Sequence, residues 1–165
     1  MPHSTYGGHY MGNKYYGYYN SPIGILEIIT SDTAIVSAMF VEEEGKKSLG
    51  ESQIFKQAIK QFDEYFKGIR KDFDIEYEMQ GTEFQKKVWD ILIEIPYGVT
   101  ISYKELAIAI GNEKASRAVG NANGKNIISI IVPCHRVIGS DKSLTGYAGG
   151  LNRKRWLLEH EGDTK

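Results

Sequence analysis

The chain has 165 residues, of which 41% are hydrophobic and 25% are charged, and it carries a formal net charge of −1. This length suits one ordinary domain or two small ones, and the composition is typical of a soluble globular protein. Apolar runs such as Ile127–Val132 are far too short to cross a bilayer, and the N-terminus lacks the layout of a secretory signal. We therefore expect a cytoplasmic protein without membrane contact.

From the N-terminus, residues 1–14 show no clear period and predict a flexible tail. Three short strands then predict a β-meander, because turn-forming dipeptides separate them. These strands are Tyr15–Asn20, Gly24–Thr30 and Ala34–Val41. Apolar residues at helical spacing predict a helix over Ser52–Lys67, with Ser52 as its cap. A strand over Phe73–Tyr77 would complete a small α+β domain over 15–79.

The second half, residues 80–165, begins with two capping boxes, in which Thr or Ser is followed three residues later by Gln or Glu. Thr82 opens one predicted helix, and Ser102 opens a second, shorter one. Gly111-Asn112 separates this second helix from a third over Ala115–Asn123. Two short helices joined by a glycine-containing turn predict a helix-turn-helix.

The helix over Ala115–Asn123 is rich in small residues, and Arg117 is its one long side chain. Small side chains let a backbone approach a neighbouring helix or a DNA groove, and both readings stay open. Residues 111–156 carry 8 Lys/Arg against 2 Asp/Glu, which would attract a phosphate backbone. Charge alone favours the plainer interpretation of a solvated surface.

Two further elements are predicted before the C-terminus. Ile127–Val132 is apolar and rich in β-branched residues, which predicts a buried strand that stops at Pro133. Leu151–Glu161 predicts a final helix. The expected inner side of this helix consists of Leu151, Trp156, Leu157 and His160.

Cys134 is the only cysteine, and it is followed by His135 and Arg136. It excludes an internal disulfide and a paired-cysteine zinc site. A thiol is a nucleophile as the thiolate, and a base such as His135 or a cation such as Arg136 promotes that form. Glu161 is a candidate carboxylate for orienting the imidazole. Taken alone, a lone cysteine is more often an inert buried hydrophobe.

The segment Ile131–Ile138 reads IVPCHRVI and resembles the active-site motif of the 6-O-alkylguanine-DNA alkyltransferases. Further stretches occur in that family's order and at its spacing. They are Phe84–Trp89, Ile95–Gly98, Ile101–Tyr103, Arg117–Gly120, Asn126, Gly146-Tyr147 and Trp156–Gly162. The resemblance is strong over 80–162 and weak over 15–79. It implies an α+β fold, in which a ribonuclease-H-like domain precedes a mostly helical, winged helix-turn-helix-like domain that binds DNA and accepts the alkyl group.

The resemblance also implies a role for each matching residue. Cys134 would be the acceptor, His135 the base acting through a water, and Glu161 the carboxylate that orients it. Asn126 would tie the active-site turn together, and Tyr103 would hydrogen-bond the departing guanine. The guanine would be bound by Val137, Tyr147 and Ala148. The DNA-contacting candidates are Arg117, Ala115, Ser116, Ala118, Gly120, Lys125 and Arg136.

The implied reaction is direct reversal of DNA damage by a monomer acting on double-stranded DNA. The alkylated guanine is flipped out of the duplex while Arg117 fills its place. Cys134 then takes the alkyl group from the 6-oxygen, and the thioether has no easy leaving group, so each molecule should act once without a cofactor. Ala148 replaces a Ser of some members, which removes a hydroxyl and keeps the backbone N–H. His3 and His9 lack the cysteine partners of an N-terminal zinc site, so we expect no metal.

Two other functions remain open. A damage-recognition module would bind alkylated guanine without reacting, although relatives of that kind lack the acceptor cysteine. A Cys-His hydrolase would turn over repeatedly and would need an oxyanion hole. The three functions differ in what happens to the protein's mass and to the substrate after mixing with alkylated DNA.

Overall fold

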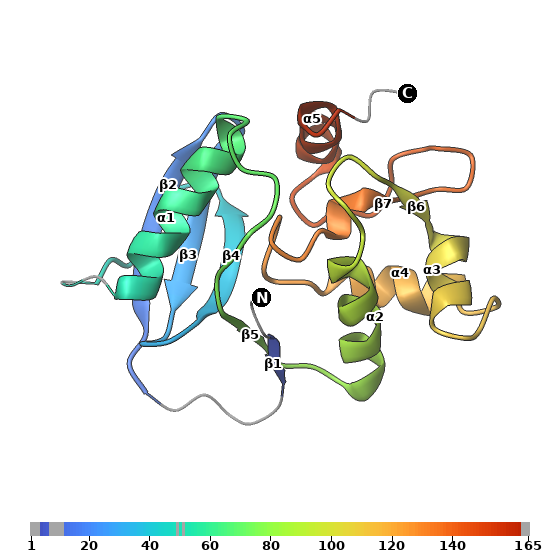
Figure 1. Ribbon diagram of the computed structural model, residues 1–165, viewed down its shortest axis with the longest axis horizontal. Coiled ribbons are helices and arrows are strands. Elements are labelled where there is room, and N and C mark those ends of the chain that lie inside the picture. Colours follow the sequence, from blue (N-terminus) through green and yellow to red (C-terminus); the bar gives the residue numbers. More distant parts are fainter. Residues whose placement is uncertain (1–3, 7–11, 49, 51, 163–165) are drawn as a thin grey trace. The chain divides into compact units, whose positions relative to one another are not determined.

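The computed structural model describes residues 4–6, for which it gives the backbone, and residues 12–48, 50 and 52–162. The chain folds into two compact units, Met1–Gln80 and Gly81–Lys165, coloured blue to green and green to red in Figure 1. Within the described ranges, no helix is both long enough and apolar enough to span a membrane.

The first unit is built on a five-stranded sheet in the order β1-β5-β4-β3-β2. Its strands are β1 (Ser4–Tyr6), β2 (Tyr15–Ser21), β3 (Gly24–Thr30), β4 (Ile35–Val41) and β5 (Tyr77–Met79). Strands β2, β3 and β4 form the predicted antiparallel meander, whereas β5 pairs in parallel with β1 and β4. Leu26, Ile28 and Thr30 are buried at alternate positions of β3, as the two-residue period of a strand requires.

Helix α1 (Gln53–Phe66) packs on this sheet against β2, β3 and β4 (Figure 1). The predicted cap is confirmed, because the Ser52 hydroxyl accepts a hydrogen bond from the Phe55 N–H at 2.9 Å. Gly17 of β2 allows the close approach of the helix, since a Cβ at this position would collide with the Phe55 ring. The first unit therefore has an ordinary core of one helix on one sheet.

Two predictions for the first unit were wrong. The last strand is Tyr77–Met79 instead of Phe73–Tyr77, because the Gln61 amide occupies both backbone groups of Asp74, at 2.9 Å each. Ser4–Tyr6 is a strand, although no regular structure was expected before residue 15. Residues 1–3 and 7–11 of that segment, including His3 and His9, lie outside the described residues.

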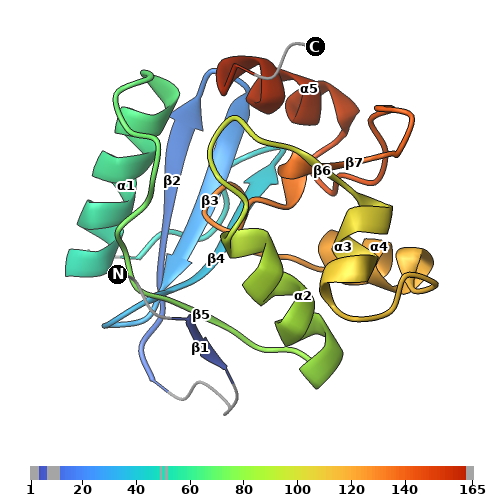
Figure 2. The same ribbon diagram turned by 45° about the vertical axis from the view of Figure 1, so that its right-hand side comes forward.

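The second unit is mostly helical, and Figure 2 shows its helices most clearly. They are α2 (Glu83–Ile93), α3 (Tyr103–Ala109), α4 (Ser116–Gly124) and α5 (Leu151–His160). Both predicted capping boxes are present, at Thr82 and at Ser102. Helices α2, α3 and α4 pack against one another, and the indole of Trp89 in α2 donates to the Ala122 carbonyl of α4 at 2.9 Å. The helix-turn-helix pair α3–α4 therefore rests on α2.

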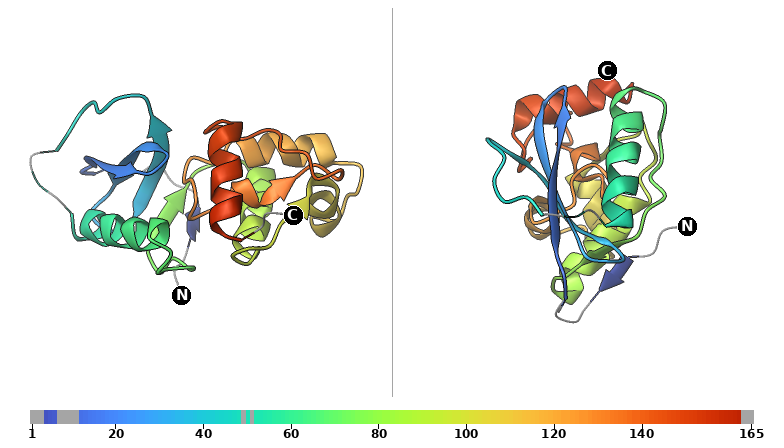
Figure 3. Two further views of the ribbon diagram at one scale, coloured as in Figure 1. Left: turned by 90° about the horizontal axis from the view of Figure 1, so that it is seen from above. Right: turned by 90° about the vertical axis from the view of Figure 1, so that its left-hand side faces the viewer.

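The chain between α4 and α5 contains a 3-10 turn, η1 (Cys134–Arg136), followed by β7 (Val137–Ile138). Strand β7 pairs in parallel with β6 (Ile101–Ser102), which directly precedes α3. Helix α5 packs on η1, and Figure 3 shows it in red beside the orange segment that contains η1 and β7. The small β6–β7 sheet thus joins the helix-turn-helix to the cysteine turn.

Two predictions for the second unit were also wrong. Ile127–Val132 is not a strand, because it folds into turns in which Ile130 has a φ of 73° and the Val132 N–H bonds the Ile128 carbonyl at 3.1 Å. Its burial was nevertheless predicted, since Ile128, Ile130 and Val132 are all buried. The inner side of α5 consists of Lys154, Leu157 and Leu158, and Leu151 is 46% exposed.

Candidate functional site

Cys134 opens η1, directly after Pro133, and only 5% of it is exposed. Its Sγ accepts a hydrogen bond from Asn126 Nδ2 at 3.2 Å. Burial raises the pKa of the thiol, and the Asn126 amide and the Lys154 ammonium act against this shift. The group at rest is therefore the thiol, and its reaction requires a base to remove the proton.

Asn126 explains why the chain before Cys134 is a loop instead of a strand. Its Nδ2 also donates to the Val132 carbonyl at 2.8 Å and the Ile128 carbonyl at 3.3 Å, and its Oδ1 accepts from the Ile128 N–H at 2.9 Å. One side chain thus satisfies backbone groups that a strand would have paired with a neighbour. The same amide fixes both the loop and the sulfur.

His135 lies fully buried beside Glu161, which follows α5. The distance between His135 Nε2 and Glu161 Oε2 is 2.8 Å. Burial lowers the pKa of His135 although Glu161 raises it, so the ring is neutral and its Nε2–H donates to the carboxylate. His135 Nδ1 then carries the lone pair, and it has no hydrogen-bond partner among the described residues. This nitrogen is available to accept a proton.

Arg136 holds the other side of the Glu161 carboxylate. Its Nε lies 2.8 Å from Oε1 and a terminal nitrogen lies 3.0 Å from Oε2, while the second terminal nitrogen donates to the Ile95 carbonyl at 2.7 Å. Burial alone would raise the pKa of Glu161, but His135 and Arg136 outweigh it and hold the pKa far below its usual range. The DNA contact of Arg136 stays a prediction, and the structure weighs against it, because the guanidinium is buried and each of its three nitrogens is already hydrogen-bonded.

Tyr103 and Lys154 both donate hydrogen bonds to one backbone carbonyl, that of Thr145. The Tyr103 hydroxyl donates to the Thr145 carbonyl at 3.0 Å, and Lys154 Nζ donates to the same oxygen at 2.7 Å and to the Val137 carbonyl at 2.6 Å. Burial lowers the pKa of Lys154 to about 8. The sequence interpretation counted Lys154 as a surface cation, because nothing local to α5 shows that its ammonium is inside.

A hollow of about 660 Å³ lies between α4 and the loop before α5. Its walls include Gly120, Asn121, Lys125, Gly146, Tyr147 and Ala148. Tyr147 is buried with no hydrogen-bond partner for its hydroxyl in the described part of the chain. Gly146 has a φ of +66°, and a Cβ there would lie 3.1 Å from the Tyr103 hydroxyl. Glycine is therefore needed for the loop to approach Tyr103.

The remaining predicted residues lie on or near α4. Arg117, Ala118 and Lys125 are exposed, whereas Ala115, Ser116 and Gly120 are half-buried. Val137 is fully buried, and Ala148 is exposed at the rim of the hollow. The structure thus brings together the cysteine, the histidine and the carboxylate, with Asn126 on the sulfur. Sequence reasoning missed Asn123, a buried polar residue whose Nδ2 donates to the Cys134 carbonyl at 3.3 Å.

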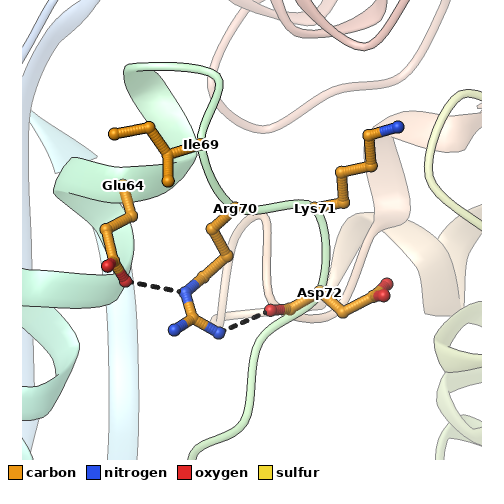
Figure 4. Close-up of a pocket in the computed structure, with 5 residues that line it drawn as sticks. All are labelled: Glu64, Ile69, Arg70, Lys71 and Asp72. Carbon is orange, nitrogen blue, oxygen red and sulfur yellow. Dashed lines mark hydrogen bonds and ion pairs between the residues drawn. The ribbon is translucent and has the colours of Figure 1, made fainter.

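The first unit has a hollow of its own, of about 410 Å³, near the end of α1. Its walls are Glu64, Ile69, Arg70, Lys71 and Asp72. Figure 4 shows the Arg70 guanidinium turned to Glu64, 3.0 Å away, and to the Asp72 carbonyl, 2.9 Å away. This hollow therefore presents an ion pair and no thiol or histidine.

The second unit combines a helix-turn-helix with a buried Cys-His-Glu cluster. This combination defines a class of DNA-binding protein that carries a thiol at its functional site. Known proteins agree with this class. Residues 83–163 match the model of the 6-O-methylguanine DNA methyltransferase DNA binding domain, and residues 14–79 match that family's ribonuclease-like domain. The chain therefore belongs to the 6-O-methylguanine DNA methyltransferase family, whose reaction is the direct reversal of DNA damage.

Individual relatives align over nearly the whole chain. A methylated-DNA–protein-cysteine methyltransferase of Methanosarcina acetivorans is 47% identical over 153 residues, which cover 90% of this chain and 98% of the relative. The crystal structure of O6-methylguanine methyltransferase from Mycobacterium tuberculosis has a TM-score of 0.83 at 43% identity and covers 93% of this chain and 95% of its own. A structure of the same organism's protein in complex with DNA has a TM-score of 0.81 at 46% identity, with 88% and 91% covered.

Proposed function

We propose that Cys134 is the acceptor of an alkyl group from the 6-oxygen of guanine in double-stranded DNA. The observation that carries this proposal is the protonation pattern around the thiol. His135 keeps an unpartnered Nδ1 while its Nε2–H is fixed by Glu161, and Asn126 holds the sulfur. A neutral buried thiol is thus followed in the chain by a neutral buried base.

The reaction forms an S–C bond and breaks the O–C bond of the alkylated guanine. His135 takes the thiol proton, directly or through a water, so that the sulfur attacks as a thiolate. Electrons of the broken bond go to the guanine oxygen, and Tyr103 stabilises the departing base by hydrogen bonding. The net result moves the thiol proton to the guanine. Glu161 stabilises the imidazolium that forms transiently.

We propose that the guanine reaches the thiol by leaving the base stack and entering the hollow beside Tyr147 and Ala148. Helix α4 exposes Arg117 and Ala118, its small residues allow close approach to a groove, and Arg117 replaces the flipped nucleotide. Flipping costs a few kcal/mol, and less for a damaged pair. The substrate class is therefore alkylated guanine, and the protein acts as a cytoplasmic monomer.

Single turnover follows from the product. A thioether at Cys134 has no easy leaving group, and Cys134 is the only cysteine of the chain, so no second thiol can regenerate it. Each protein molecule is consumed by one alkyl group.

The test is the stoichiometry of transfer from a duplex that carries a radiolabelled methyl group on one guanine. With DNA in tenfold excess, we expect the label on protein to stop at one methyl per molecule, and Cys134→Ala to take up none while still binding the DNA. Repeated loss of label to small products would indicate a hydrolase. Binding without transfer by the unchanged protein would indicate a damage-recognition module.

A further inference from the structure

Asn123 is a buried polar residue on the inner side of α4. Only 1% of it is exposed, although its neighbours Asn121 and Gly124 face solvent. The rest of that inner side is apolar, with Val119 and Ala122. A buried amide is costly unless it is hydrogen-bonded, so its partners show what it does.

The amide nitrogen of Asn123 donates to the Cys134 carbonyl at 3.3 Å. The backbone carbonyl of Asn123 accepts from the Asn126 N–H at 3.4 Å, and the Asn126 side chain donates to the Cys134 sulfur at 3.2 Å. The end of α4 therefore holds Cys134 at two points. Asn126 fixes the sulfur, and Asn123 fixes the backbone that carries it.

The Asn123 side chain acts as a hydrogen-bond donor. Its Oδ1 has no hydrogen-bond partner among the described residues, so the amide nitrogen is the atom that bonds. An aliphatic residue or a carboxylate cannot perform this task. Tyr103 lies against the same helix, because a Cβ at Gly120 would lie 3.6 Å from its ring, and its hydroxyl donates to the Thr145 carbonyl at 3.0 Å.

We propose that Asn123 is a positioning residue for alkyl transfer, because it ties the backbone of Cys134 to the helix that docks on DNA. This inference rests on the proposed function. It assigns Asn123 to the alignment of the attacking sulfur with the group that stabilises the departing guanine. Since the side chain faces inward, Asn123 acts on the chemical step and leaves DNA binding unchanged.

The test uses single-turnover kinetics on a duplex that contains one 6-O-methylguanine. Asn123→Leu removes both donors at similar size, and Asn123→Asp keeps the shape without the N–H groups. The matched control is Asn152→Leu, because Asn152 is an exposed residue of α5. A small misalignment of reacting groups costs one to two powers of ten in rate. We expect both Asn123 variants to lower the maximal rate by about tenfold or more, with the half-saturating DNA concentration within about twofold of wild type.

A double-mutant cycle with Tyr103→Phe separates positioning from a general structural role. If Asn123 aligns the Cys134 sulfur with Tyr103, the combined loss is smaller than the product of the two single losses. Three results would overturn the proposal. The losses of maximal rate could multiply in the double variant, the Asn123 variants could keep maximal rates within twofold of wild type, or only the half-saturating DNA concentration could change. If Asn123→Leu unfolds at the assay temperature, the same rates and the same double-mutant cycle are measured with Asn123→Asp.

The wild-type protein separates this inference from the function on which it rests. If wild type methylates Cys134 and the Asn123 variants match its rate, only the positioning role fails. If wild type leaves Cys134 unmodified, both proposals fall together.

Discussion

Each unit of the chain contains an arginine–glutamate ion pair, and the two pairs differ in how deeply they are buried. In the first unit, the Arg70–Glu64 ion pair lies at the surface, and each of its side chains is 26% exposed. In the second, Glu161 has no exposed side-chain surface, and its partners His135 and Arg136 are 0% and 8% exposed. Buried charge is costly unless it is paired and hydrogen-bonded. The second unit therefore bears a cost in stability that the first unit avoids, and this cost is concentrated around the cysteine.

The largest expected effect comes from breaking one ion pair in each unit. Glu161→Gln leaves a buried guanidinium without its counter-charge, which typically costs about 3–5 kcal/mol. Glu64→Gln removes the charge from a solvated pair and should cost about 0–1 kcal/mol. Both tryptophans, Trp89 and Trp156, lie in the second unit. Urea unfolding followed by their fluorescence, with far-ultraviolet circular dichroism for the whole chain, measures the difference.

Equal losses of unfolding free energy in the two variants would contradict the comparison. They would mean that the Glu161 carboxylate is as well solvated as that of Glu64.

The next effect concerns the product of the reaction. A methyl group on Cys134 enlarges a side chain that is 5% exposed and disturbs the 3.2 Å hydrogen bond from Asn126. Overpacking of this kind costs about 1–3 kcal/mol, so the alkylated protein should melt at a lower temperature than the free protein. A benzyl group should lower the melting temperature further. An unchanged or higher melting temperature would show that the adjoining hollow has room for the adduct.

The sequence predicts the features of the two units that depend on neighbouring residues. It fails for features that depend on residues far apart in the chain. The capping boxes at Thr82 and Ser102 involve residues three apart, and both were predicted. The Ile127–Val132 strand was wrong because the Asn126 side chain, outside the apolar run, takes over the backbone hydrogen bonds. The buried ammonium of Lys154 depends on carbonyls 9 and 17 residues away, and no local pattern in the sequence contains that information.

The residues of the candidate site also divide into those that a local motif predicts and those that it does not. Cys134 and His135 are adjacent in the sequence, so the motif alone singles out both residues. Glu161, 26 residues from His135, was a candidate because a Cys-His relay needs a carboxylate, and the family resemblance pointed to the same residue. Arg136 was predicted to contact DNA from its charge, since the sequence does not show that the Glu161 carboxylate binds it. Asn123 was missed because its partner, the Cys134 carbonyl 11 residues away, meets it only in the folded unit.

A third measurement tests whether the second unit alone supplies the side chains that repair of a duplex requires. Arg117→Ala should slow repair of a duplex by about tenfold or more, because only a duplex requires a flipped base. Its reaction with free 6-O-methylguanine base should change by less than about twofold on the same reasoning. Lys56→Ala, an exposed cation of α1 in the first unit, is the control and should change neither rate. Equal slowing on both substrates would make Arg117 a structural residue.

The smallest expected effect is on the salt dependence of binding. Each phosphate contact contributes about −0.9 to the slope of log binding constant against log salt. Lys125 is exposed at the wall of the hollow, so Lys125→Ala should reduce the magnitude of this slope by about 1. Lys56→Ala should leave the slope unchanged. A change of similar size in both variants would spread the DNA contact over both units.

The most direct test of the account locates the methyl group after reaction. The protein is mixed with an equimolar duplex that contains 6-O-methylguanine, digested, and analysed by tandem mass spectrometry. The account predicts a gain of one methyl group on the peptide that contains Cys134, and no gain on any other peptide. A methyl group on another residue, or an unmodified Cys134 peptide after the DNA has been repaired, would contradict it.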